Sequence, residues 1–145
     1  MGGRLTFPFG GYYHASKHAV EALSDALRYE VRPFGIDVSI IEPGLITTRF
    51  GATASATLAA TTAADSPYRT SIAALEKSIR ESYDSRMMTA GPERVARSID
   101  NALTAAWPRS RYVVTAAARA LITVRASSSG KVWDRVVKTT MRLPQ

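Results

Sequence analysis

The sequence predicts an α/β fold that is mostly helical and contains two short strands. Apolar residues recur at helical spacing from Ala19 to Val31, which predicts an amphipathic helix. A β-branched run from Ile36 to Ile41 is stopped by Pro43-Gly44, as is typical of a buried strand that enters a loop. A second, shorter strand is expected at Tyr112-Val113-Val114.

The remaining elements are predicted to be helices separated by turn residues. The first helix should begin after Gly10-Gly11 and end near Pro33. The segment from Ala52 to Ala64 is small and polar, so either a loop or a weak helix is expected there. Further helices are expected from Pro67 to Met87 and from Pro92, which suits a first helical turn, to about Trp107.

Composition excludes several classes of protein. At 145 residues with 46% apolar content the chain can bury a core. The absence of cysteine excludes disulfides and cysteine-based metal sites or nucleophiles. No stretch of ~20 apolar residues is present to span a bilayer. Met1-Gly2-Gly3-Arg4 leads into a broken apolar stretch unlike a signal peptide, so a cytoplasmic location is predicted.

Tyr13 and Lys17 are the most informative pair of residues. A separation of four places both side chains on one helix face, one turn apart. A lysine ammonium beside a phenol favours the phenolate and lowers the phenol pKa, and a phenol tuned in this way can act as a general acid or base. The alternative is an ordinary solvated contact on a helix surface.

Two histidines lie on the same expected helix. His14 and His18 have a spacing that can bind a metal, but further ligands are needed and no glutamate lies between them as in a zinc-protease motif. We therefore predict no metal site and a partly exposed helix surface for both histidines.

Three motifs in order give a family resemblance. Tyr13-x-Ala15-Ser16-Lys17 is followed by Gly35-Ile36-x-Val38 and then by Pro43-Gly44-x-x-x-Thr48. In order and spacing, this stretch resembles the active-site half of the short-chain dehydrogenase/reductase family. Downstream, Gly91-Pro92-Glu93-Arg94-Val95-Ala96 and Pro108-Arg109-Ser110-Arg111-Tyr112 resemble the retinol- and steroid-dehydrogenase-like branch.

The resemblance implies a fold and an activity. The fold would be the C-terminal half of a doubly wound, Rossmann-type parallel sheet. The activity would be that of an NAD(P)-dependent oxidoreductase that interconverts an alcohol and a ketone or aldehyde, with a lipophilic substrate. Tyr13 matches the catalytic acid/base and Lys17 the residue that lowers its pKa and binds the nicotinamide ribose. Pro43, Gly44, Ile46 and Thr48 match the loop that holds the cofactor, NAD or NADP. The alternative for Thr48 is a helix N-cap.

The sequence also departs from the family pattern. The family's catalytic serine lies thirteen residues before the tyrosine, which here falls just before Met1. No glycine-rich strand–turn–helix for a dinucleotide is found. We therefore expect a C-terminal half that is inactive in isolation. The alternative is a non-catalytic remnant that associates through the motif helix, which would also support a homo-oligomer.

A substrate-binding loop is implied between Gly51 and Ala90. By resemblance this segment closes over the nicotinamide, and mobile lids of this kind exclude water. Its large side chains could line a lipophilic pocket, although ordinary packing is favoured for each one. These residues are Tyr68, Tyr83, Met87 and Met88.

The charge divides the chain into two parts. Residues 1–108 carry eleven basic and eleven acidic residues, whereas residues 109–145 carry eight basic residues against Asp134 alone. We assign 1–108 to the oxidoreductase part and 109–145 to a basic, partly amphipathic helical tail. Its basic stripe is formed by Lys131, Arg135, Lys138 and Arg142. Trp133 at the edge of its apolar face would suit an anionic membrane surface, with packing on the domain as the alternative. No nucleic-acid motif is present, so no such partner is expected.

Overall fold

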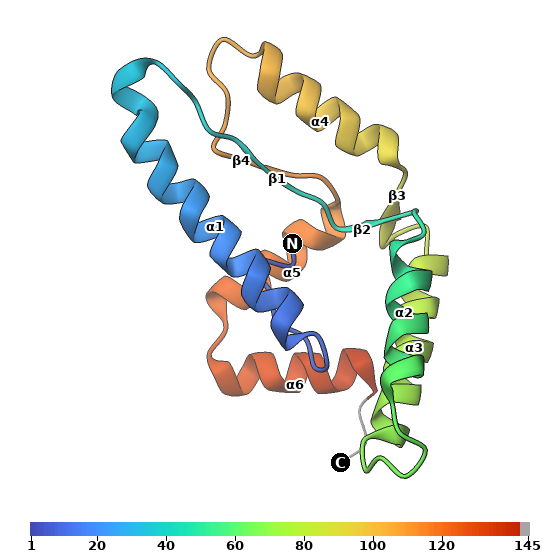
Figure 1. The fold of residues 1–145 in the computed structure, drawn as a ribbon. Coiled ribbons are helices and arrows are strands. Elements are labelled where there is room, and N and C mark those ends of the chain that lie inside the picture. The colour runs from blue at the N-terminus through green and yellow to red at the C-terminus, as the bar shows by residue number, and fades with distance from the viewer. Residues whose placement is uncertain (143–145) are drawn as a thin grey trace.

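A computed structural model describes residues 1–142 as a set of helices and short parallel strands (Figure 1). The helices are α1 (Gly11–Val31), the 3-10 helix η1 (Arg32–Phe34), α2 (Phe50–Thr61), α3 (Arg69–Asp84), α4 (Pro92–Thr104), α5 (Ala116–Ser127) and α6 (Gly130–Met141). The strands are β1 (Ile40–Glu42), β2 (Leu45–Ile46), β3 (Thr89–Ala90) and β4 (Arg111–Val113).

The two predicted strands form a parallel pair. Ile40 lies opposite Arg111 and Glu42 lies opposite Val113, so β1 and β4 run in the same direction. Helices α1 and α4 flank this pair on opposite sides (Figure 1), which confirms the mostly helical α/β fold, a partial Rossmann-type arrangement. β1 begins later than the predicted run at Ile36.

A second parallel pair joins β2 to β3, with Leu45 opposite Thr89. The sequence did not predict these strands, because two residues are too few to show an alternating pattern.

The helix boundaries follow local sequence signals. Gly35 ends η1 in the left-handed region at φ +71°, where glycine has no side chain to clash, and its N–H donates to the Arg32 carbonyl at 3.0 Å. Pro92 occupies the first turn of α4, as predicted, but α4 ends at Thr104 rather than near Trp107. The segment left open as loop or weak helix forms α2.

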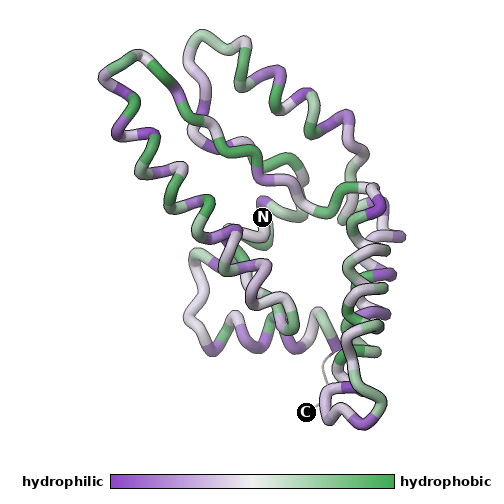
Figure 2. The backbone as a smooth tube through the Cα atoms, viewed as in Figure 1, coloured by the Kyte–Doolittle hydropathy of each residue, from purple (hydrophilic) through white to green (hydrophobic). Residues whose placement is uncertain are grey.

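The main buried cluster joins the first residues of the chain to α6. Leu5, Trp133 and Val137 are buried together, and their partly buried neighbours are Met1, Phe7, Leu121, Ile122, Val136 and Met141. Figure 2 shows α6 changing between hydrophobic and hydrophilic along its length, as expected of a helix with one packed face. Trp133 is only 6% exposed, so its indole packs in the core, which agrees with packing of the tail helix on the domain and not with an apolar edge turned to a membrane.

The basic stripe of α6 remains on the surface. Lys131, Arg135 and Lys138 are exposed, while Arg142 forms an ion pair with Glu81 of α3 at 3.2 Å. Contact of this stripe with a membrane stays a prediction. Among the helices of residues 1–142, none combines the length and apolarity needed to cross a bilayer.

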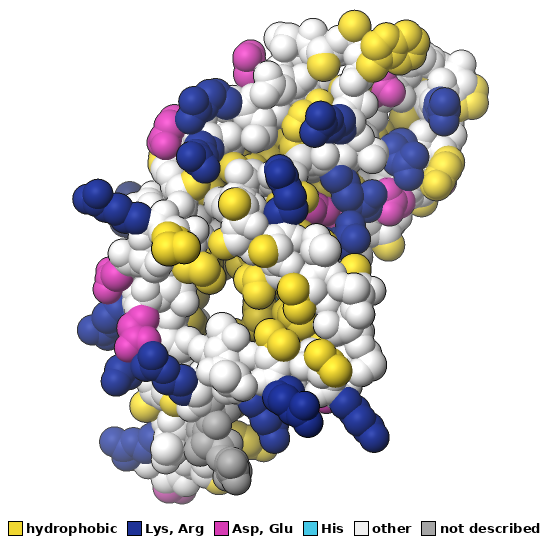
Figure 3. Space-filling view, turned by 180° about the vertical axis from the view of Figure 1, so that it is seen from behind, with side chains coloured by type: hydrophobic (Ala, Val, Ile, Leu, Met, Phe, Trp, Pro, Cys, Tyr) yellow, Lys and Arg dark blue, Asp and Glu magenta, His cyan; other side chains and the backbone are white. Residues whose placement is uncertain are grey.

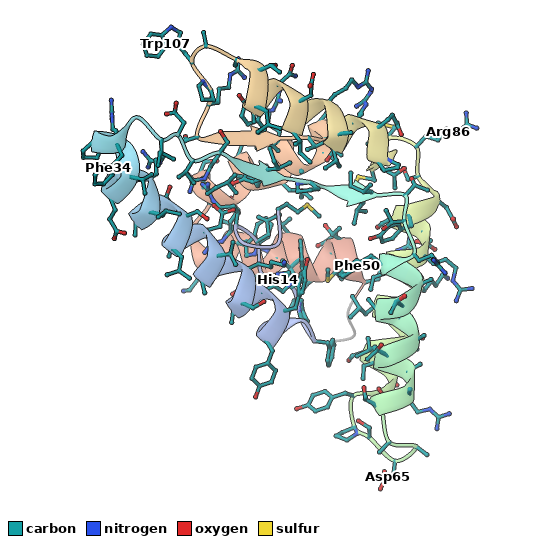
Figure 4. The ribbon with its side chains drawn as sticks, turned by 45° about the horizontal axis from the view of Figure 1, so that its top comes forward. His14, Phe34, Phe50, Asp65, Arg86 and Trp107 are labelled. Carbon is teal, nitrogen blue, oxygen red and sulfur yellow. The ribbon has the colours of Figure 1, made fainter. Side chains whose placement is uncertain are left out.

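The apolar stripe predicted on α1 lies on the surface. Val20, Leu23 and Leu27 are all exposed. At the end of the molecule away from the first turn of α1, Phe34 and Trp107 also point outward (Figure 4).

Candidate active site

Tyr13 and Lys17 lie on one face of the first two turns of α1, as their spacing predicts. The Lys17 ammonium nitrogen is 5.7 Å from the centroid of the Tyr13 ring. No carboxylate lies within 4.0 Å of that nitrogen among residues 1–142. The Tyr13 side chain is 43% exposed, so both the phenol and the ammonium remain accessible to a ligand.

The Tyr13 ring is bounded on two sides. Phe50, the first residue of α2, has its ring centroid 5.7 Å away at a tilt of 41°. Figure 4 shows Phe50 at the end of α2 that faces α1. On another side, a Cβ placed on Gly2 would come within 3.0 Å of the Tyr13 ring, so backbone is packed against it. The phenol therefore lies in an aromatic and backbone-lined site rather than on an open helix surface.

The loop after β1 lies next to the same N-terminal residues. The Pro43 carbonyl accepts a hydrogen bond from the Met1 amino nitrogen at 2.8 Å. Because Met1 contacts this loop and Gly2 contacts Tyr13, the first two residues lie between the loop and the motif helix. The structure thus connects Pro43 to the Tyr13 face through two consecutive residues.

Gly44, Ile46 and Thr48 have local structural roles in this loop. A Cβ on Gly44 would collide with the Thr115 hydroxyl, so the close approach of the loop to the start of α5 requires glycine. Ile46 lies opposite Ala90 in the β2–β3 pair. The Thr48 hydroxyl accepts a hydrogen bond from the Phe50 N–H at 3.3 Å, and Arg49 rather than Thr48 is the N-cap residue of α2. The Thr48 hydroxyl proton is still available to a ligand.

A charged cluster lies directly upstream of this loop. Arg111 of β4 binds Glu21 at 3.1 Å and Asp25 at 2.6 Å on α1, and Glu42 of β1 at 3.3 Å. Arg4 lies 3.5 Å from the Glu42 carboxylate. The Glu42 side chain is 2% exposed, and this burial, with the nearby Glu21 carboxylate, raises its pKa. The cluster ties α1, β1 and β4 together beside the site.

The α2–α3 pair occupies the segment expected to form the substrate-binding loop. Tyr83 packs over Gly51, where an added Cβ would lie 2.7 Å from its ring, and burial raises the pKa of Tyr83. Tyr68 meets the Phe9 ring edge-on at 5.8 Å, whereas Met87 points into solvent. Seen from behind, the molecule has a hollow beside α2 and α3 with hydrophobic side chains along its rim (Figure 3). Met88 is half-buried.

The prediction of a partly exposed helix surface is wrong for His14. His18 is exposed, but His14 is only 7% exposed because its ring packs against Phe7 and Tyr13. Periodicity could not show this, because the segment that covers His14 precedes the helix. Within residues 1–142, no group of three or more histidine, aspartate or glutamate side chains is arranged to hold a metal ion.

Comparison with known proteins decides the family. The sequence profile of short chain dehydrogenase matches residues 1–59. The uncharacterized oxidoreductase YbbO of Escherichia coli (strain K12) is 34% identical over 136 residues, which cover 94% of this chain and 45% of the relative. This chain belongs to the short-chain dehydrogenase family. Within the family, 17-beta-hydroxysteroid dehydrogenase type 6 of Rattus norvegicus is 63% identical over 41 residues, which cover 28% of this chain and 13% of the relative.

A third relative names its cofactor. The NADPH-dependent 3-dehydrocapnine reductase of Ornithobacterium rhinotracheale is 38% identical over 112 residues, which cover 77% of this chain and 38% of the relative. The chain therefore spans less than half the length of these curated relatives.

The side chains that remain free in the site suit a nicotinamide cofactor. The Lys17 ammonium has no carboxylate partner among residues 1–142, and the Thr48 hydroxyl and Tyr13 phenol can each donate a proton. The two hydroxyl donors and the Lys17 ammonium lie near the loop after β1, and these groups can form hydrogen bonds with ribose hydroxyls and a phosphate. Nothing in residues 1–142 forms the glycine-rich turn that would hold the rest of a dinucleotide.

Proposed function

We propose that this chain carries the proton-transfer part of an NAD(P)-dependent oxidoreductase that interconverts an alcohol and a ketone or aldehyde. The observation that supports it most directly is the accessible Tyr13 phenol on the face of α1 that is bounded by Phe50. The neighbouring Lys17 ammonium has no carboxylate partner within residues 1–142. The Tyr13 ring is flanked by Phe50 of another helix and by the backbone of Gly2, and 43% of the residue surface remains exposed.

In this proposal Tyr13 donates its phenolic proton to a carbonyl oxygen, or accepts the proton of an alcohol in the reverse direction. The Lys17 ammonium stabilises the phenolate that remains and donates hydrogen bonds to the ribose. The Thr48 hydroxyl donates a hydrogen bond to a phosphate oxygen, and the backbone of Pro43, Gly44 and Ile46 orients the nicotinamide. The cofactor, NAD or NADP, supplies or accepts the hydride when bound.

The substrate is proposed to be lipophilic. The hollow beside α2 and α3 has an apolar rim, and Phe9, Phe50 and Tyr68 are exposed large apolar side chains on the elements around the site. One relative is named as a hydroxysteroid dehydrogenase, which is consistent with this class. Binding of such a substrate would cover the exposed rings and exclude water from Tyr13.

A chimera provides the test. Residues 1–142 would replace the matching segment of the 3-dehydrocapnine reductase, and NADPH oxidation would be followed with the substrate of that enzyme. Tyr13→Phe is expected to lower turnover by about 10²–10⁴-fold, since it removes the proton donor. Tyr12→Phe is the matched control, because Tyr12 immediately precedes Tyr13 and is 97% exposed. Equal turnover in the two variants would contradict the proposed role of Tyr13.

A second candidate function is association with another copy through α1. Val20, Leu23 and Leu27 form an exposed apolar stripe on one helix, and large contiguous exposed apolar patches mark interaction surfaces. Leu23→Glu would place a charge in the stripe and is expected to shift a dimer to monomer in size-exclusion chromatography with light scattering. A monomeric wild-type chain at high concentration would refute this candidate without affecting the first.

A further inference from the structure

His14 contacts the segment that precedes α1. Its Nδ1 atom lies 3.0 Å from the Gly2 carbonyl oxygen, twelve residues earlier in the chain. The imidazole ring is 7% exposed and meets the rings of Phe7 and Tyr13 edge-on, at centroid distances of 5.7 and 5.4 Å. Figure 4 shows His14 on the inner side of α1. A histidine on an unused helix surface would have none of these contacts.

The hydrogen bond fixes the tautomer of the ring. A carbonyl oxygen can only accept, so Nδ1 must carry the proton and donate it to Gly2. An unpaired buried carbonyl or imidazole N–H is costly, so the bond and the burial support each other.

The segment held by this bond packs on the face that carries the catalytic pair. A Cβ on Gly2 would lie 3.0 Å from the Tyr13 ring, and a Cβ on Gly3 would lie 2.6 Å from the Lys17 carbonyl oxygen. The two consecutive glycines therefore let the backbone lie directly against the turns of α1 that carry Tyr13 and Lys17. The Gly2 carbonyl is bound by His14, which follows Tyr13 in sequence.

We propose that His14 is a positioning residue that holds the Gly2-Gly3 backbone against Tyr13. It acts through Gly2 and does not touch a substrate. With the segment in place, one side of the phenol is covered by backbone, and the open side faces Phe50 and the loop after β1. The catalytic importance of this contact rests on the proposed function of Tyr13, whereas the contact itself does not.

Nuclear magnetic resonance on the chain without cofactor tests the proposal. In the wild-type protein, the ¹⁵N shifts of His14 are expected to show a proton on Nδ1. A nuclear Overhauser effect is expected between Gly2 Hα and the Tyr13 ring protons. The amides of Arg4 and Leu5, which donate to the Met1 carbonyl at 2.9 and 3.2 Å, are expected to exchange slowly.

Three variants separate positioning from stability. His14→Leu removes the donor, and we expect loss of the Gly2–Tyr13 effect and about tenfold faster exchange at Arg4 and Leu5. His14→Asn is expected to restore both, because its amide nitrogen can take the place of Nδ1. His18→Leu, one turn further and exposed, is the matched control and is expected to leave both unchanged.

Two results would overturn the proposal. One is a wild-type His14 that is protonated at Nε2 alone, which needs no variant and so decides even if His14→Leu does not fold. The other is a folded His14→Leu protein that keeps the Gly2–Tyr13 effect and slow exchange. Because none of these measurements is an enzymatic turnover rate, their outcome is independent of the chimera assay for Tyr13.

Discussion

Replacing Arg111 by methionine tests whether the charged cluster holds the sheet to α1. The Arg111 side chain is 24% exposed and contacts three carboxylates, of which that of Glu42 is almost fully buried. Methionine keeps much of the apolar length of arginine but leaves Glu42 with only Arg4, at 3.5 Å, as a nearby side-chain cation. The variant therefore leaves a buried carboxylate without its nearest partner.

The expected loss follows from the burial of Glu42. Removing one partner from a fully buried ion pair costs about 3–5 kcal/mol, whereas an exposed pair contributes about 0–1 kcal/mol. Because Arg111 is partly exposed and Arg4 remains, we expect a loss of about 2–3 kcal/mol in the free energy of unfolding. For a chain of this size that corresponds to a fall in Tm of about 6–9 °C.

Urea denaturation followed by circular dichroism measures this loss. Arg142→Met is the matched control, because Arg142 and Glu81 are 65% and 47% exposed and their pair should contribute less than about 1 kcal/mol. The Arg111 hydrogen bond holds the pKa of Asp25 below its usual value of 3.8, so that contribution is present above this pH and is lost as the pH falls through the depressed pKa. The difference between Arg111→Met and wild type should therefore shrink in acid. A loss no larger than that of Arg142→Met would refute the reasoning.

Three further changes have definite expected outcomes. Gly44→Ala is expected to lower the free energy of unfolding by about 1–3 kcal/mol in thermal melts, because the added methyl group would collide with Thr115. In a Thr115→Ala background, Gly44→Ala should cost less of that free energy. Trp133→Ala should cost about 3–5 kcal/mol by urea denaturation, while the exposed neighbour Val132→Ala should be near neutral; equal losses would contradict the core packing. Burial raises the folded-state pKa of Glu42 above its usual 4.5, so the stability of the wild-type protein should fall as the pH rises through the raised pKa. Glu42→Gln should remove this fall. Parallel stability profiles against pH for the two proteins would contradict the burial argument.

Patterns within one element were sufficient to predict most of the fold. The helical spacing from Ala19 to Val31 and the β-branched run before Pro43 correspond to α1 and β1, and Pro92 begins α4. Each of these signals depends on neighbours in sequence. The two-residue strands β2 and β3 could not be predicted in this way, because their only signal is the pairing of residues far apart in the chain.

The relative placement of Tyr13 and Lys17 on one helix face could be predicted from the sequence, but their surroundings could not. The spacing of Tyr13 and Lys17 places them on one face, as observed, and their catalytic role stays a prediction. The burial of His14 was missed, whereas packing of Trp133 on the domain was one of the two alternatives for the tail helix. The His14 ring packs against Phe7, in a segment with no periodic pattern, so a helical wheel drawn for α1 treats the position of His14 as surface.

Polar side chains recur at every fourth residue of α1, and this spacing links the charged cluster to the site. Tyr13 and Lys17 are followed at the same interval by Glu21 and Asp25, and this interval keeps successive side chains on one face. The last two bind Arg111 of β4, so the contact made two and three turns after Tyr13 fixes the rotation of α1 about its own axis. A helix held only by its apolar stripe could not be fixed in this way, because Val20, Leu23 and Leu27 are exposed. The orientation of the Tyr13 phenol toward Phe50 therefore depends on ion pairs with β4 as well as on local packing.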